Sequence, residues 1–79
     1  MTRESIFQII VEHIREVLPE LAGEQITLED SLRELGANSV DRMEILVSVM
    51  QSLGVKIPMV NFGKASNIGD LVRIFQEGN

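Results

Sequence analysis

Apolar residues recur at spacings of three and four along three separate stretches of the chain, the pattern of helices that bury one face. The stretch over residues 3–18 has its apolar positions at Phe7, Ile10, Ile14, Val17 and Leu21, widened by Ile6, Ile9 and Leu18. The stretch over 39–53 has them at Val40, Met43, Leu46, Val47, Met50 and Leu53, and the stretch over 68–76 at Ile68, Leu71, Val72 and Phe75. No segment shows the strict alternation of a strand. The sequence therefore predicts one all-α domain over residues 1–79, a bundle of three main helices.

Residues that begin and end helices lie at the edges of these stretches. Thr2 can cap the first helix through its hydroxyl, and Pro19 should end that helix near residue 18 because it lacks an amide hydrogen. Gly54 follows the second helix, as glycine often does. Asn67 is expected to cap the third, with the carboxylate of Asp70 reaching back as in a capping box.

A long connection of about twenty residues, 19–38, separates the first two helices. A loop of this length in a small domain usually has a function or contains a short helix. Residues 30–35 are expected to form one turn closed by Gly36, and residues 59–64 either a short helix or a turn. The apolar side chains expected to tuck beneath the loop are Ile26, Leu28, Leu32 and Leu35.

Composition excludes several classes of function. There is no Cys and only one His, His13, so a zinc site of ordinary spacing cannot form, and His13 is expected to be a solvated residue on a helix surface. The formal net charge of −5 disfavours nucleic acid and anionic lipid as partners and favours partners with basic patches. Because the chain has neither a signal-peptide pattern nor a long apolar run, a cytoplasmic location is expected.

The most informative segment is Leu35-Gly36-Ala37-Asn38-Ser39-Val40-Asp41, where a glycine turn ends in a serine at the start of a long helix. In one interpretation, Ser39 is simply the cap of that helix, since serine is a preferred N-cap. In the other, its hydroxyl carries a phosphate group, which the free amides and the dipole of a helix N-terminus would stabilise.

This segment, followed by Met43-Glu44-Ile45, resembles the attachment motif of acyl carrier proteins. Val55-Lys56-Ile57-Pro58 and Ile68-Gly69-Asp70-Leu71-Val72 come next in the family's order and spacing, so the resemblance covers nearly the whole chain. It implies a four-helix bundle with a short third helix and a 4′-phosphopantetheine arm on Ser39 that holds acyl groups as thioesters. It also implies a monomeric carrier without catalytic residues, which works with a phosphopantetheinyl transferase, an acyltransferase and a ketosynthase.

A second serine matches the family's usual Asp-Ser-Leu tripeptide more closely, because Asp30-Ser31-Leu32 spells it out. Ser31, however, has only four residues between it and Gly36, opens no long helix and is preceded by no Leu-Gly turn. We therefore predict that Ser39 is the attachment site and that Ser31 caps the short turn before Gly36.

The chain departs from the family's pattern around the attachment site, with Asn38 where Asp is usual and Val40 where Leu is usual. Fewer acidic residues follow the attachment site than in fatty-acid carriers, although Asp41 and Glu44 remain as acids for partner recognition. The residues predicted to contact partners are Asn38, Val40, Asp41, Met43, Glu44, Met59, Val60 and Phe62. This partly apolar face is similar to free-standing carriers of polyketide synthase clusters, and within them to donor carriers of β-branching cassettes. Such donors hand an acetyl unit to a hydroxymethylglutaryl-type synthase.

Three alternatives remain open at this point. A carrier of fatty-acid synthesis or a peptidyl or aminoacyl carrier would share the fold and the arm. An unmodified helical interaction module would lack the arm, but a DNA-binding one would need a basic face. The predicted helix over 39–53 has only Arg42 against Asp41 and Glu44.

Overall fold

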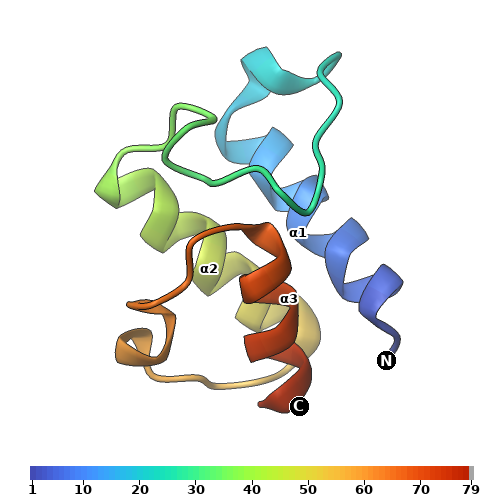
Figure 1. Cartoon of the computed structure of the whole chain (residues 1–79), viewed down its shortest axis with the longest axis vertical. Helices are drawn as coiled ribbons and strands as arrows, with labels where there is room; N and C mark the ends of the chain where they lie inside the picture. Colours follow the sequence, from blue (N-terminus) through green and yellow to red (C-terminus); the bar gives the residue numbers. More distant parts are fainter. Residues whose placement is uncertain (79) are drawn as a thin grey trace.

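The computed structural model describes residues 1–78 and contains three α-helices, α1 (Arg3–Val17), α2 (Ser39–Leu53) and α3 (Ile68–Glu77). Two short 3₁₀ helices, η1 (Pro19–Leu21) and η2 (Met59–Phe62), lie in the connections, and no strand is present among these residues (Figure 1). The all-α prediction is confirmed, and the short third helix expected from the family is the four-residue η2. None of the helices formed by residues 1–78 is long and apolar enough to span a bilayer.

Each α-helix begins at a side-chain cap. Thr2 Oγ1 accepts a hydrogen bond from the amide of Ser5 at 3.1 Å, so the predicted cap of α1 is confirmed. The helix ends at Val17, one residue earlier than predicted, because Leu18 before Pro19 leaves helical geometry. Gly54 adopts a positive φ of 68° after α2, a conformation that glycine reaches without the clash of a Cβ.

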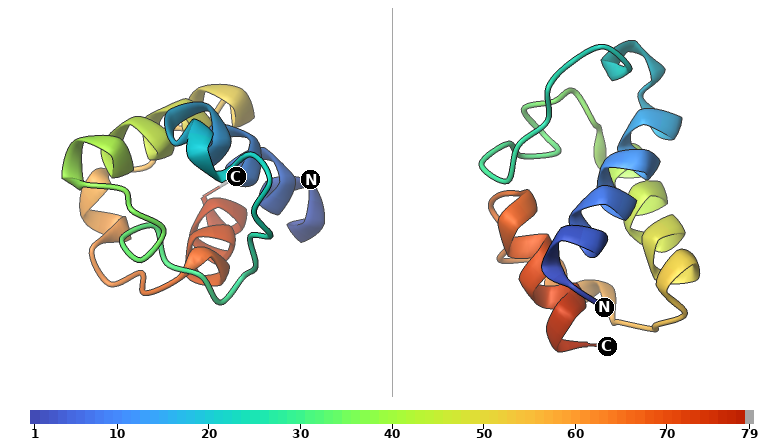
Figure 2. Two further views of the ribbon diagram at one scale, coloured as in Figure 1. Left: turned by 90° about the horizontal axis from the view of Figure 1, so that it is seen from above. Right: turned by 90° about the vertical axis from the view of Figure 1, so that its right-hand side faces the viewer.

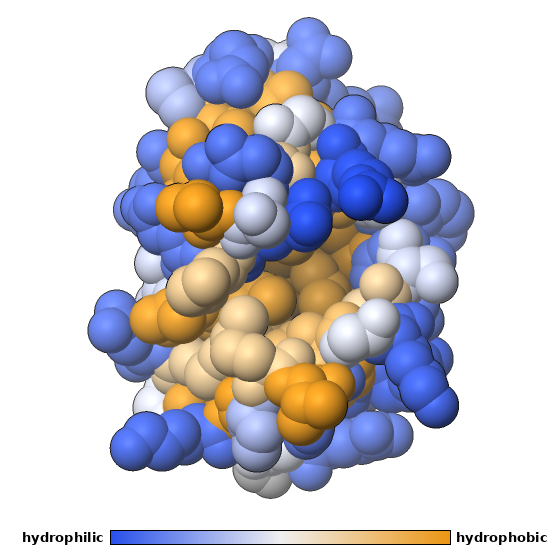
Figure 3. All heavy atoms as spheres, turned by 90° about the vertical axis from the view of Figure 1, so that its left-hand side faces the viewer, coloured by the Kyte–Doolittle hydropathy of each residue, from blue (hydrophilic) through white to orange (hydrophobic). Residues whose placement is uncertain are grey.

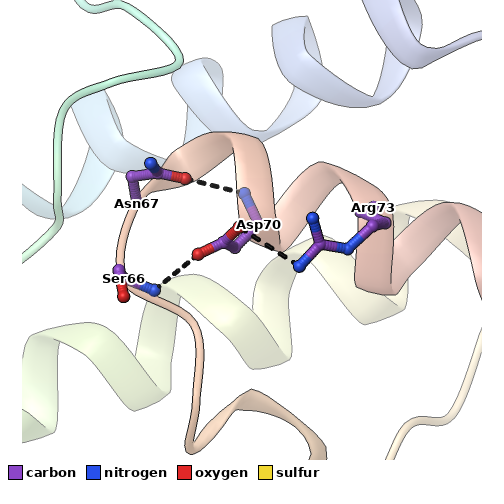
Figure 4. A network of polar contacts seen from close by, with 4 residues as sticks. All are labelled: Ser66, Asn67, Asp70 and Arg73. Atoms are coloured by element: carbon purple, nitrogen blue, oxygen red, sulfur yellow. Dashed lines mark hydrogen bonds and ion pairs between the residues drawn. The ribbon is translucent and has the colours of Figure 1, made fainter.

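The start of α3 differs from the prediction in one contact (Figure 4). Asn67 Oδ1 accepts from the amide of Asp70 at 2.9 Å, as expected for a cap. The carboxylate of Asp70 accepts instead from the amide of Ser66 at 2.8 Å, one residue before the predicted partner. A second carboxylate oxygen lies 3.2 Å from Arg73 Nη2. These bonds hold the pKa of Asp70 below its usual value, the Ser66 amide contributing most.

Helix α1 is the shared support of the fold, because it packs against both α2 and α3 (Figures 1 and 2). No Cα atom of α2 lies within 8 Å of one in α3, so each of these helices packs on α1 and not closely on the other. Phe62 of η2 packs on Phe75 with ring centroids 5.1 Å apart. The most deeply buried side chains are Ile6, Ile10, Ile14, Ile45, Val49, Ile68, Val72 and Phe75.

The buried face of α2 overlaps only in part with the predicted one, because Leu46 is buried and Met50 and Leu53 pack against the core. Ile45, Leu46 and Val49 are buried, whereas Val40, Met43 and Val47 are exposed. The helix has two apolar stripes, and periodicity alone does not decide which of them meets α1. In α1 the face is close to the predicted one, with Val11 buried and Phe7 only partly so.

The long loop over residues 18–38 is tied to the start of α3. The amides of Ile68 and Gly69 donate to the carbonyls of Asp30 and Leu28 at 2.8 and 2.9 Å, so loop acceptors satisfy the first amides of the helix. Ile26 and Leu32 are buried beneath the loop, as predicted, but Leu28 is 41% exposed. The loop therefore has a fixed course across one end of the bundle (Figure 2, left).

Candidate functional site

A tight turn over residues 31–37 delivers the chain to the start of α2. Ser31 Oγ accepts from the amide of Glu34 at 3.0 Å, so Ser31 caps this turn as predicted. The amide of Ala37 then donates to the carbonyl of Leu32, and Gly36 takes a φ of 106°, which favours glycine. Leu32 and Ala37 are buried, which anchors both ends of the turn on the core.

The cap of α2 is Asn38, and the interpretation of Ser39 as the cap is therefore wrong. Asn38 Oδ1 accepts from the amide of Asp41 at 2.8 Å, and Asp41 Oδ2 accepts from the amide of Asn38 at 3.1 Å. This reciprocal pair is a capping box built with Asn and Asp. Asn38 thus replaces the usual Asp without loss of the helix cap, and Ser39 becomes the first residue inside the helix.

Ser39 is exposed, and its hydroxyl is not used to hold the helix end. The amides of Ser39 and Val40 belong to the first turn, whose N–H groups have no acceptor within the helix. Neither amide donates to another group of residues 1–78. A phosphodiester on Ser39 would meet these donors and the positive end of the helix dipole, so the residues present fit a phosphate-linked cofactor.

Arg42 is a neighbour of Ser39 that sequence reasoning missed. Its Nη1 donates to the carbonyl of Ala37 at 2.8 Å, which holds the guanidinium beside the turn. Ser39, Arg42 and Leu46 succeed one another at spacings of three and four and share one face of α2. This spacing was readable from the sequence, although the apolar pattern drew attention to another face of the helix.

A cavity of about 510 Å³ opens on this side of the molecule, between α2 and α3. Leu46 of α2, Leu71 of α3 and Phe62 of η2 contribute to its lining, together with the turn residues Leu32 and Arg33 and with Arg42. The face shown in Figure 3 is hollowed, with a hydrophobic floor and strongly hydrophilic side chains above it.

The predicted partner residues do not all lie on the surface. Val40, Met43, Met59 and Val60 are exposed by 67, 53, 43 and 83%, and Glu44 is also exposed. Asp41 is partly buried and holds the cap. Phe62 is buried against Phe75, so its predicted place on an exposed docking face is wrong. Val47, which was predicted to be in the core, is 39% exposed instead.

Comparisons with known proteins identify the family of this chain. A family model described as "Phosphopantetheine attachment site" matches residues 8–75. The chain belongs to the acyl carrier protein family. A Bacillus subtilis (strain 168) protein named polyketide biosynthesis acyl-carrier-protein AcpK is 43% identical over 77 residues, 98% of this chain and 94% of its own length. An acyl carrier protein of Helicobacter acinonychis (strain Sheeba) is 31% identical over 72 residues, 86% of this chain and 92% of its own length.

A solved structure extends the likeness of the carrier to three dimensions. It is the crystal structure of the curacin biosynthetic pathway HMG synthase in complex with acetyl donor-ACP, and the matching chain is 40% identical with a TM-score of 0.89. The alignment covers 95% of the carrier and 96% of that chain. The predicted family and fold are therefore confirmed, and 4′-phosphopantetheine is the cofactor of the carrier.

The prediction that His13 is a solvated residue on a helix surface is wrong. Its side chain is 17% exposed, with Nδ1 2.7 Å from Glu16 Oε1 and Nε2 2.7 Å from Ser52 Oγ. The order Ser–His–acid resembles a nucleophilic triad, but Ser52 lies in the last turn of α2, where the dipole is negative. The amides just beyond it, of Gly54 and Val55, donate to carbonyls of α2 and cannot stabilise an oxyanion. The arrangement therefore links α1 to the end of α2.

Proposed function

We propose that Ser39 carries the 4′-phosphopantetheine arm and that this protein is an acyl donor carrier of polyketide biosynthesis. The single observation that supports the site is the capping box, because Asn38 and Asp41 hold the helix end and leave the Ser39 hydroxyl exposed. The arm, when attached, supplies a thiol that holds the acyl group as a thioester. The side chains of the carrier position that thioester and take no part in the acyl-transfer chemistry.

Attachment is tested by incubating the apo-protein with a broad-specificity phosphopantetheinyl transferase and coenzyme A. Mass spectrometry of the wild type and of Ser31→Ala should show one arm, and Ser39→Ala should show none. Ser31→Ala is the matched control, because it removes the other candidate serine and a turn cap while leaving α2 unchanged. An arm on Ser39→Ala would show that the arm is attached elsewhere. Loss of the arm from Ser31→Ala alone would assign the attachment to Ser31.

Exposed apolar side chains on α2 and η2 support a role as an acetyl donor to a synthase of the hydroxymethylglutaryl type. We call them together the docking face: Val40, Met43 and Val47 of α2 and Met59 and Val60 of η2. Exposed apolar patches mark partner sites, and methionine adapts to varied surfaces. The Bacillus subtilis relative is named for polyketide biosynthesis, and the solved neighbour pairs a donor carrier with an HMG synthase.

The donor role is tested by attaching an acetylated arm from radioactive acetyl-coenzyme A with the phosphopantetheinyl transferase, and by measuring acetyl transfer to purified hydroxymethylglutaryl-type synthase. Met43→Asp and Val60→Asp should lower the transfer rate at limiting carrier concentration. Leu28→Asp, which changes a 41% exposed apolar residue outside the docking face, should leave that rate unchanged. If a fatty-acid ketosynthase accepts the acyl group and the hydroxymethylglutaryl-type synthase does not, the carrier belongs to fatty-acid synthesis. An equal loss in all three variants would show that the docking face has no special role.

A further inference from the structure

The cavity between α2 and α3 has a charge opposite to that of the whole protein. The chain contains twelve acids and seven basic residues, with a net charge of −5. The lining formed by the described residues nevertheless includes Arg33 and Arg42 and no Asp or Glu. A local reversal of charge at the entrance to an apolar hollow favours a ligand with an anionic end and a carbon body.

The two guanidinium groups differ in how firmly they are held. Arg42 is partly buried and has one donor fixed on the carbonyl of Ala37, which leaves its other donors available. Arg33 is exposed and forms no ion pair with the described residues. Guanidinium groups bind carboxylates in a planar, two-bond geometry that a lysine cannot provide.

The proposed attachment site lies on the face of α2 that borders the same cavity, although Ser39 itself is not part of the lining. Ser39, Arg42 and Leu46 are on one face of α2, and the latter two line the hollow. An arm that starts at Ser39 therefore begins one helical turn from Arg42. The ligand placed at the highest effective concentration is the tethered acyl group itself.

We propose that this cavity binds the anionic end of the carrier's own cargo, so that a dicarboxylic acyl unit such as malonyl docks against Arg33 and Arg42 and acetyl does not. This inference rests on the proposed attachment of the arm to Ser39. The carboxylate would meet the two guanidinium groups, and the chain leading to it would lie over Leu46, Phe62 and Leu71. The protein would then distinguish a cargo that still has its carboxylate from one that has lost it.

Amide NMR spectra of ¹⁵N-labelled holo-protein test this binding with four forms of the arm: unloaded, acetyl, malonyl and acetoacetyl. Acetoacetyl matches malonyl in size but replaces the charged oxygen with a methyl group. The unloaded arm has the phosphodiester and no carboxylate, so it separates binding of the phosphate from binding of the cargo. We expect shifts at Leu46, Phe62 and Leu71 with malonyl that neither acetyl nor acetoacetyl produces.

Two substitutions assign the interaction to the guanidinium groups. Arg33→Gln should lower the docked malonyl population about fivefold, the effect of losing a partly exposed ion pair, and high salt should act in the same direction. Arg42→Lys keeps the charge and should retain part of the shift. Arg3→Gln, a matched loss of positive charge at the start of α1 and outside the cavity lining, should have no effect.

The outcomes separate this inference from the proposed function. Equal shifts with malonyl and acetoacetyl, or none with malonyl, would overturn charge-selective binding while the arm on Ser39 remained established. Shifts that already appear with the unloaded arm would assign the guanidinium groups to the phosphodiester and refute binding of the cargo. Failure to attach any arm at Ser39 would overturn the proposed function and this inference together.

Discussion

The capping box of α2 allows the cost of a single side chain to be worked out. Asn38→Ala removes the 2.8 Å bond from the Asp41 amide and keeps the 3.1 Å bond from its own amide to the Asp41 carboxylate. Asn38 is exposed, so the freed amide of Asp41 can turn to water, and the loss should be near the typical value for a helix cap, about 1 kcal/mol. A domain of this length has a total stability of about 4–12 kcal/mol, so the change should lower the melting temperature by about 4–8 °C.

Thermal unfolding monitored by circular dichroism measures this effect. Asn38→Asp should melt close to the wild type, because its carboxylate can accept the same bond. Thr2→Ala removes the cap of α1 in the same way and gives a matched cost far from the site. Ser39→Ala, at the neighbouring position, should unfold within about 0.5 kcal/mol of the wild type because its hydroxyl caps nothing. The reasoning is refuted if Asn38→Ala melts with the wild type, or if Ser39→Ala costs as much as Asn38→Ala.

Three further predictions concern stability. The five acids over residues 20–34 form no ion pair with the described residues, and Arg15 donates to the carbonyl of Glu24 and not to a carboxylate. Moderate salt or Mg²⁺ should therefore screen the repulsion among these acids and raise the melting temperature by about 2–4 °C. A melting temperature that neither changes would contradict this repulsion. The pKa of Asp70 is lowered in the fold, so the stability that its carboxylate contributes is complete well above pH 3.8 and is lost as pH falls through the lower, folded pKa. Asp70→Asn should therefore be less stable than the wild type at neutral pH, and this difference in stability should shrink below pH 3.8. A difference that stays constant in acid titrations would exclude the carboxylate as its cause. Gly54→Ala places a Cβ on a residue with left-handed backbone angles and should lower the free energy of unfolding in urea by about 1–2 kcal/mol. Gly23→Ala, at an ordinary φ and with no atom near the added Cβ, should lower it less. Equal losses in the two variants would show that the backbone angle is not the cause.

Helix boundaries were predictable because capping chemistry is local. Thr2, Gly54 and Asn67 act within one turn of their own positions, and all three have the predicted roles. The interpretation of Ser39 as a cap was wrong for a related reason. Two neighbouring residues could each cap α2, and the position of Asp41 three residues after Asn38 decides in favour of Asn38.

The buried face of α2 was only partly predictable from periodicity. Val40, Met43 and Val47 satisfy the same spacing as the true core residues, and only the packing of α1 selects between the two stripes. For Phe62 the local pattern could not show that Phe75, thirteen residues later, lies against it. The bridge from His13 to Ser52 likewise spans 39 residues, beyond the reach of any local rule.

The local setting of the proposed attachment site was largely predictable, because it depends on a turn and a helix start. Ser31 precedes only a short turn, whereas Ser39 precedes a long amphipathic helix, and the structure gives each serine the expected local setting. The position of Arg42 at the cavity was missed, because the cavity exists only where α2 and α3 lie apart, and the sequence does not show this separation.

The separation of α2 from α3 has a consequence for how such a protein can evolve. Because α1 packs against both neighbours and these do not pack closely against each other, a smaller side chain between α1 and α3 should change the width of the hollow more than the position of α2. The lining of the hollow and the cap of α2 are formed by different side chains. Selection can then adjust one of these features without disturbing the other.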